Sequence, residues 1–268
     1  MTERIVESGG APLLHIVDGE GPVVALALHD GHLLRPGLAS HLVLPEDERL
    51  REEDPFTALM APDGVTKVTV VRSRFEVDLN RPRFRAVYQG RADAWGLKLY
   101  DGELPDEFDR VSRAAYDTFY STAFDVLARI AETHRRFVVF DLHSYNHRRD
   151  GAGAPAAMVA ENPEVNVGTL RIDRERWAPV VDSFIGCMTA RGFDCRENVK
   201  FGGGHFAHWV AQTFPEQGAT LAIEFKKTYM DEWDGSVDQQ AVARIKEALS
   251  DAVSSVESVL DKVDASNE

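Results

Sequence analysis

The chain of 268 residues has few cysteines and no excess of basic residues. Its two cysteines, Cys187 and Cys195, do not form a CxxC metal motif, so we expect free thiols in a reducing compartment. Lys and Arg number 30 against 44 Asp and Glu, which gives a formal net charge of −14. Such a surface repels nucleic acids and anionic membranes. An anionic substrate would therefore need arginines concentrated locally against the overall field.

Long apolar runs and targeting signals are also missing. No stretch approaches the roughly 18–20 apolar residues that a membrane helix needs. The amino-terminal segment lacks a basic start followed by a long apolar run, so we expect no signal peptide and a cytoplasmic location. No glycine motif typical of phosphate binding is present, which argues against a nicotinamide-dependent enzyme.

The sequence does contain an alternation of short apolar strands with helical patterns. Periodicity predicts strands at 23–28, 65–71, 137–142 and 220–225, and helices at 46–60 (interrupted by Pro55), 106–132, 174–191 and 237–263. Another short strand or strand exit is expected at 75–80. Because no repeat or linker divides the chain, we expect residues 1–268 to form one α/β domain. Its sheet should be open, twisted and mixed or mostly parallel, with helices on both faces.

Two of the apolar strands end in histidine. Val23 to Leu28 is followed by His29-Asp30-Gly31-His32, and Val138 to Leu142 leads directly into His143. Open α/β sheets build their ligand sites at the carboxyl ends of strands, so the two histidines together indicate a metal site. The alternative is that they are two unrelated loop residues.

A catalytic zinc ion usually has three protein ligands from His and carboxylates and keeps one position for water. We expect His29 and His143 to be two of the ligands. Glu53 is the predicted third, because sets of two histidines and one carboxylate are common; it could equally be a solvated helix charge. His32, three residues after His29, is the other candidate, and it could instead line the substrate pocket.

Three arginines and an asparagine lie between residues 73 and 83. Asn80 and Arg81 can together clamp a carboxylate through charge-assisted hydrogen bonds. Arg74 can face an oxyanion that develops during a reaction. The alternative interpretation is a charged surface turn.

A single carboxylate, Glu224, interrupts the apolar strand from Leu221 to Phe225. Burying it is costly unless it is paired or functional. Burial would raise its pKa toward the range that is useful for a general base. The alternative is a structural glutamate in a salt bridge. The glycine bend at 201–205 can let the backbone approach a substrate closely.

Taken in order over residues 23–235, these motifs resemble the N-formylglutamate amidohydrolase family. The elements are His-x-Gly at 29–31, Ser-Arg-Phe through Val-Asp-Leu-Asn-Arg at 73–81, Asp-Leu-His-Ser at 141–144, Asn-Val-Gly at 166–168, the glycine bend, and Ile-Glu through Tyr-Met-Asp-Glu at 223–232. The family is similar to zinc carboxypeptidases and aspartoacylase-type deacylases. The resemblance implies their fold, with Asn80 and Arg81 binding the substrate carboxylate, His143 as a metal ligand and Glu224 as the base.

The chain departs from these relatives around His29. The carboxypeptidase His-x-x-Glu is His29-Asp30-Gly31-His32 here, and the usual Pro-His-Ser-Gly is Leu-His-Asp-Gly. The third ligand therefore stays open between Glu53 and His32, and the substrate preference could differ.

The resemblance implies metal-dependent hydrolysis of a small anionic N-acyl amino acid. The expected substrate is N-formyl-L-glutamate, cleaved to formate and L-glutamate, with one divalent metal ion, expected to be zinc, as cofactor. Arg148 is the predicted contact for the second carboxylate of glutamate. The alternatives are a deacylase for another N-acyl amino acid, a carboxypeptidase-like peptidase, and an inactive metal- or ligand-binding domain. The oligomeric state is not predicted.

Overall fold

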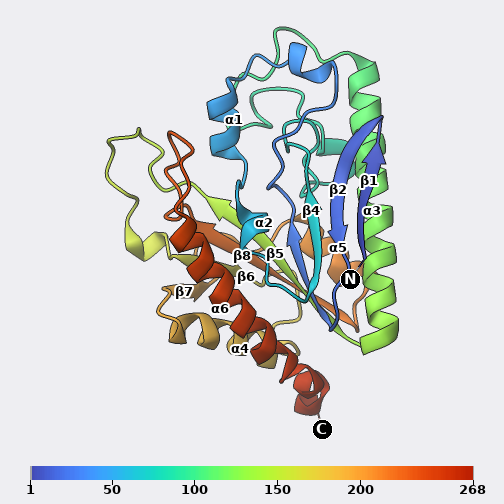
Figure 1. Ribbon diagram of the computed structural model, residues 1–268, viewed down its shortest axis with the longest axis vertical. Helices are drawn as coiled ribbons and strands as arrows, with labels where there is room; N and C mark the ends of the chain where they lie inside the picture. Colours follow the sequence, from blue (N-terminus) through green and yellow to red (C-terminus); the bar gives the residue numbers. More distant parts are fainter. Residues whose placement is uncertain (1, 268) are drawn as a thin grey trace.

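A computed structural model describes residues 2–267 as one eight-stranded sheet with helices on both faces (Figure 1). The strands are β1 (Glu3–Ser8), β2 (Ala11–Val17), β3 (Val23–Ala27), β4 (Thr66–Val70), β5 (Phe137–Tyr145), β6 (Val165–Gly168), β7 (Cys195–Glu197) and β8 (Gly218–Lys226). The α-helices are α1 (Glu46–Glu52), α2 (Thr57–Met60), α3 (Asp106–His134), α4 (Ala178–Ala190), α5 (His205–Thr213) and α6 (Gln239–Glu257). The predicted α/β class is confirmed.

The centre of the sheet is parallel and its edges are mixed. The strand order is β1-β2-β4-β3-β5-β8-β6-β7, in which β4, β3, β5 and β8 run parallel to one another. Antiparallel pairs join β1 to β2, β2 to β4, and β6 to β8. Every residue of β3 and β5 is buried, as expected for strands covered on both faces. Their carboxyl ends meet at one edge of the sheet, where a ligand site is expected.

Helices cover the two faces of the sheet and enclose a separate core on each. Helices α3 and α5 lie on one face, and α4 and α6 lie on the other (Figure 1). Neighbouring residues of β3 alternate between these cores: Val24 and Leu26 pack in the first, Val23 and Ala25 in the second. No helix within the described residues is long and apolar enough to cross a membrane.

The strand expected at 75–80 is instead a series of turns. Main-chain N–H groups of Glu76 and Arg81 bond back to the carbonyls of Ser73 (3.0 Å) and Asp78 (3.3 Å). The Arg72 guanidinium pairs with Glu76 at 2.7 Å in the buried interior, which fixes the chain in this compact path. Segment 73–81 therefore folds across the end of the sheet and brings its polar side chains toward β3.

Candidate active site

Three segments far apart in sequence deliver polar side chains to the carboxyl edge of the sheet. His29 lies two residues beyond the end of β3, and His143 lies within the last part of the neighbouring β5. Asp54 comes from the irregular segment between α1 and α2. Its main-chain N–H donates to the carbonyl of His29 at 3.0 Å, which ties this segment to the end of β3.

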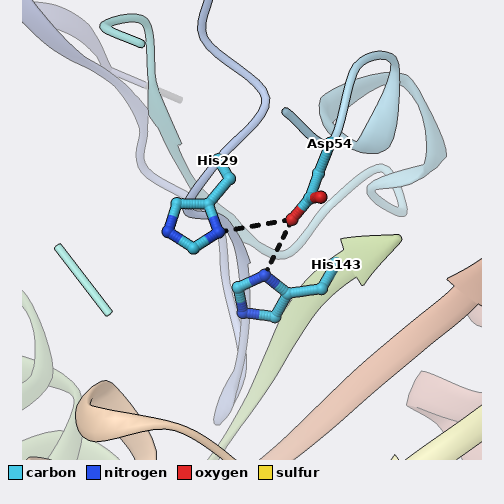
Figure 2. Close-up of side chains that lie close together, drawn as sticks. All are labelled: His29, Asp54 and His143. Carbon is cyan, nitrogen blue, oxygen red and sulfur yellow. Dashed lines mark hydrogen bonds and ion pairs between the residues drawn. The ribbon is translucent and has the colours of Figure 1, made fainter. Parts of the chain in front are cut away.

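His29, Asp54 and His143 form a buried group that can hold a metal ion. Both histidines direct Nδ1 toward Asp54 Oδ2, at 3.3 Å from His29 and 3.0 Å from His143 (Figure 2). All three side chains are at most 4% exposed. Two imidazole nitrogens and one carboxylate oxygen are a donor set that suits a catalytic zinc ion with one position left open. The residues present therefore fit the metal that the sequence predicts.

A second carboxylate lies behind each histidine. His29 Nε2 is 2.9 Å from Asp78 Oδ1, and His143 Nε2 is 3.0 Å from Asp141 Oδ1. A carboxylate at Nε2 favours a proton on that nitrogen, so Nδ1 is the nitrogen that a metal ion would take once it displaces the proton shared with Asp54. The hydrogen bond between His29 Nε2 and Asp78 thus fixes the ring of His29, and Asp141 forms an ion pair with the ring of His143.

The charges within the group stabilise one another. Burial would raise the pKa of Asp54, but the hydrogen bonds from His143 and His29 lower it overall, so the carboxylate is ionised. Burial opposes the charged form of His143, while Asp141 raises its pKa strongly. Without a metal ion the group therefore holds protons that a bound cation would displace.

The structure places Asp54, and not Glu53 or His32, in this group. Glu53 has extended backbone (φ −80°, ψ 179°), so its side chain and that of Asp54 point to opposite sides. The fully buried Glu53 carboxylate accepts from Ser73 Oγ and lies 2.5 Å from His32 Nδ1. The ligand role of Glu53 or His32 stays a prediction, and Asp54 is the carboxylate that the geometry groups with the two histidines. Sequence reasoning missed Asp54 by a single position in an irregular segment.

Glu224 lies beside the group, on β8. It is paired in register with His143, and its carboxylate has no hydrogen bond or ion pair with the described side chains of residues 2–263. Burial raises the pKa of Glu224 to about 8, with the charges of Asp54 and Asp141 adding to the shift and His143 opposing it. A carboxyl group held in this way is suited to exchange a proton near neutral pH.

A cavity of about 280 Å³ opens over these residues. His29, Asp54, His143 and Glu224 lie in its wall, together with the glycine bend from Gly202 to Gly204. The cationic side chains in its wall are Arg51, Arg74, Arg149 and Lys227. The expected local concentration of arginines in an acidic protein is therefore present.

Asp78 forms ion pairs with two arginines of segment 73–81. Its Oδ2 lies 3.0 Å from Arg74 Nη2 and 3.2 Å from Arg81 Nε, and it accepts from Tyr88 Oη at 2.5 Å. Arg74 reaches the cavity and stacks on Trp95 at 4.8 Å. Arg81 is not among the described residues that line the cavity. It stacks on Tyr88 and donates to the carbonyl of Asp93 at 2.7 Å.

Asn80 lines the cavity and has a fixed amide orientation. Its Oδ1 accepts from the main-chain N–H of Phe206 at 3.0 Å, which caps the start of α5 from another segment. The Nδ2 donor is therefore the end that is available to a ligand. A Cβ at Gly204 would lie 2.3 Å from this side chain, so the bend requires glycine at that position.

The structure places Arg149, and not Arg148, at the cavity. Arg149 Nη2 lies 3.3 Å from Glu52 Oε2 at the cavity wall. The main-chain N–H of Arg148 donates to Glu232 at 2.5 Å, and Arg148 lines a separate hollow together with Glu232. The substrate contact of Arg148 stays a prediction, and Arg149 is the arginine of this pair that lines the cavity. His32 is likewise not among the described residues that line the active-site cavity.

Comparison with known proteins places this arrangement in a family. A sequence model of the N-formylglutamate amidohydrolases matches residues 21–230. The structure is similar to the N-formylglutamate amidohydrolase from Ralstonia eutropha JMP134, with a TM-score of 0.74, 15% identity, and coverage of 93% of this chain and 99% of that one. A gene product from Agrobacterium tumefaciens has a TM-score of 0.68, 17% identity, and coverage of 93% and 96%. No match is found among curated proteins.

Because the family match spans most of the chain, the protein belongs to the N-formylglutamate amidohydrolase family. At these low identities the solved structures establish the fold alone, and they agree with the predicted class.

Proposed function

We propose that residues 1–268 act as one catalytic domain that hydrolyses N-formyl-L-glutamate to formate and L-glutamate with a bound zinc ion. The observation that supports this most is the position of Glu224. A half-buried carboxylate, without a hydrogen-bond partner among the described side chains, lies on the strand next to His143, in a cavity whose wall also holds His29 and Asp54. A base beside a metal-ligand set is the arrangement that amide hydrolysis needs.

Each residue has a distinct part in the proposed mechanism. When bound by His29, Asp54 and His143, zinc supplies Lewis-acid polarisation of the amide carbonyl and lowers the pKa of water. Glu224 takes a proton from the attacking water and passes it to the leaving nitrogen, so that the C–N bond breaks and the amine departs neutral. The Arg74 guanidinium stabilises the negative charge that develops on the carbonyl oxygen.

The substrate's two carboxylates are bound by different parts of the wall. Asn80 Nδ2 donates to the α-carboxylate, and Arg81 supports this region from behind through its contact with Asp78. Arg149, at the wall formed with Glu52, binds the side-chain carboxylate. This pattern of donors selects an N-acyl amino acid that carries a second negative charge.

A substrate panel tests the proposal. Formate or acid release is measured for N-formyl-L-glutamate, N-formyl-L-alanine, N-acetyl-L-glutamate and a dipeptide, before and after chelation and after zinc is restored. We expect the highest kcat/KM for N-formyl-L-glutamate, with activity lost on chelation and regained with zinc. Preference for another acyl group or for the dipeptide would replace the substrate assignment. Bound zinc with no turnover on any compound would favour a binding domain.

A further inference from the structure

Two buried side chains from the segment that follows β8 hold the main chain on both sides of Asp54. Lys227 is 1% exposed, and its Nζ donates to the carbonyls of Arg51 at 2.6 Å and Glu53 at 2.7 Å. Tyr229 is fully buried, and its Oη donates to the carbonyl of Pro55 at 2.9 Å. Asp54 therefore lies between fixed peptide groups on either side.

The segment around Asp54 needs such support because it has no regular structure of its own. Helix α1 ends at Glu52 and α2 begins at Thr57, so Asp54 lies outside any repeating pattern of main-chain hydrogen bonds. Its own peptide groups bond to the His29 carbonyl through the N–H and to Thr57 Oγ1 through the carbonyl, at 2.8 Å. The carbonyl bonds from Lys227 and Tyr229 fix the path of the chain before and after it.

Lys227 is also an unusual residue to bury. An ammonium group loses much solvation in the interior and must recover it through hydrogen bonds. Its two hydrogen bonds go to neutral main-chain carbonyls, and no ion pair joins it to the described side chains of residues 2–263. The charges of Asp54, Glu52 and Glu232 attract the ammonium group, and its two hydrogen bonds go to the segment that carries Asp54.

From these contacts we infer that Lys227, assisted by Tyr229, is a positioning residue for the metal ligand Asp54. The same segment carries Glu224 three residues earlier, so one strand exit supplies the base and sets the third ligand. The inference rests on the proposed metal site. It goes beyond the proposed reaction, in which neither Lys227 nor Tyr229 has a part, by giving the segment after β8 a role in metal binding.

Electrostatics and positioning predict opposite results when Lys227 is replaced. A cation near a metal site repels the metal ion, so removing its charge alone would strengthen metal binding. Losing the two carbonyl bonds instead frees Asp54 to move and weakens binding. Replacement of groups that orient a metal ligand typically lowers metal affinity on the order of 10–100-fold.

The experiment measures the zinc Kd of purified metal-free protein by competition with a chromogenic chelator, without substrate. We expect Lys227→Met to raise the Kd roughly 10–100-fold. Tyr229→Phe, which removes one hydroxyl, should raise it by a smaller factor. Lys226→Met is the matched control, because Lys226 Nζ donates to the carbonyl of Asn162 at 3.0 Å, away from the metal group. Its Kd should equal that of the wild type.

The outcomes distinguish positioning of Asp54 by Lys227 from a purely structural role of this lysine. An unchanged or lower Kd in folded Lys227→Met overturns the inference, even if urea unfolding shows a loss of stability, because that loss alone indicates a merely structural role. If Lys227→Met does not fold, an unchanged Kd in Tyr229→Phe overturns it. The proposed substrate can fail in the turnover panel while these Kd differences stand. A wild-type protein that binds no zinc would overturn both proposals and is recognised from its own titration.

Discussion

His143 and Glu224 lie directly opposite each other on the neighbouring parallel strands β5 and β8. Side chains at paired positions of adjacent strands project to the same face, and the strands are about 4.8 Å apart. The main-chain ladder, and not a loop, therefore sets the separation between a candidate metal ligand and the candidate base. The geometry of proton transfer is built into the centre of the sheet.

Replacing Glu224 by Gln should abolish proton transfer while keeping the shape of the side chain. We expect kcat for N-formyl-L-glutamate to fall on the order of 10²–10⁴-fold. The zinc content should stay the same, because Glu224 is not in the ligand group. Steady-state kinetics and elemental analysis measure the two effects. Glu216→Gln, at an exposed glutamate just before β8, is the control and should keep full activity. Near-full activity of Glu224→Gln would rule out the proposed base.

The raised pKa of Glu224 predicts a pH-dependent stability of the metal-free protein. Its pKa is about 8 in the folded state against an ordinary value of 4.5. Between these values the native state keeps a proton that the unfolded chain releases. The free energy of unfolding should therefore fall as pH rises from about 5 to 8, by at most about 1.4 kcal/mol per pH unit from this group.

Urea unfolding of the metal-free protein at pH 5.5 and pH 7.5 measures this effect. Glu224→Gln cannot ionise, so its stability relative to the wild type should increase between the two pH values. Parallel pH dependence of the two proteins would show that Glu224 titrates in its ordinary range.

Asp54 and Glu53 provide a matched pair for the identity of the third ligand. Asp54→Asn removes the negative donor that faces both histidines, and we expect zinc affinity to fall by more than about 10²-fold, beyond the range seen for residues behind a ligand. Glu53→Gln disturbs the contacts with His32 and Ser73, so it should lower stability and leave zinc affinity within a few-fold. Chelator competition and urea unfolding separate the two effects. The reverse ranking of zinc affinities would restore Glu53 as the ligand.

Arg149 and Arg148 form a second matched pair, for the side-chain carboxylate of the substrate. A hydrogen bond to a charged group contributes about 1.5–3 kcal/mol, so Arg149→Met should raise KM for N-formyl-L-glutamate roughly 10–100-fold. The KM for N-formyl-L-norleucine, which lacks the second charge, should not change. Arg148→Met should resemble the wild type with both compounds. An equal loss for both substrates in Arg149→Met would mean that the arginine supports the cavity wall and does not select charge.

The helices and strands could be predicted because buried apolar residues recur along them at regular intervals. The strand predicted at 137–142 lies within β5, and the helix predicted at 106–132 is α3 with two further residues. Both elements are buried at regular intervals, so their apolar residues recur with the period of a strand or a helix. This period is visible in the sequence and predicts the element. His143 and Glu224 interrupt such apolar strands, which is why the sequence singles them out.

Sequence and structure favour different residues in two segments that have no hydrophobic period. The backbone angles where α1 ends decide whether the side chain of Glu53 or that of Asp54 points toward the histidines. In an extended segment neighbouring side chains point to opposite sides, so a shift of one residue would exchange the two. After the end of β5, Arg148 and Arg149 likewise line different cavities although they are neighbours in the sequence. Lys227 has no recognisable motif, because its partners are main-chain carbonyls from a segment more than 170 positions earlier.

The carbonyl bonds of Lys227 have a consequence for how this protein can diverge. Every residue type has the same carbonyl group, so Lys227 constrains the backbone at Arg51 and Glu53 but not their side chains. The Arg51 side chain, which faces the cavity, can therefore be exchanged during evolution or in the laboratory without releasing Asp54. Substrate choice and metal retention are thereby separable at Arg51, where a new side chain can change specificity while the metal-binding residues stay in place.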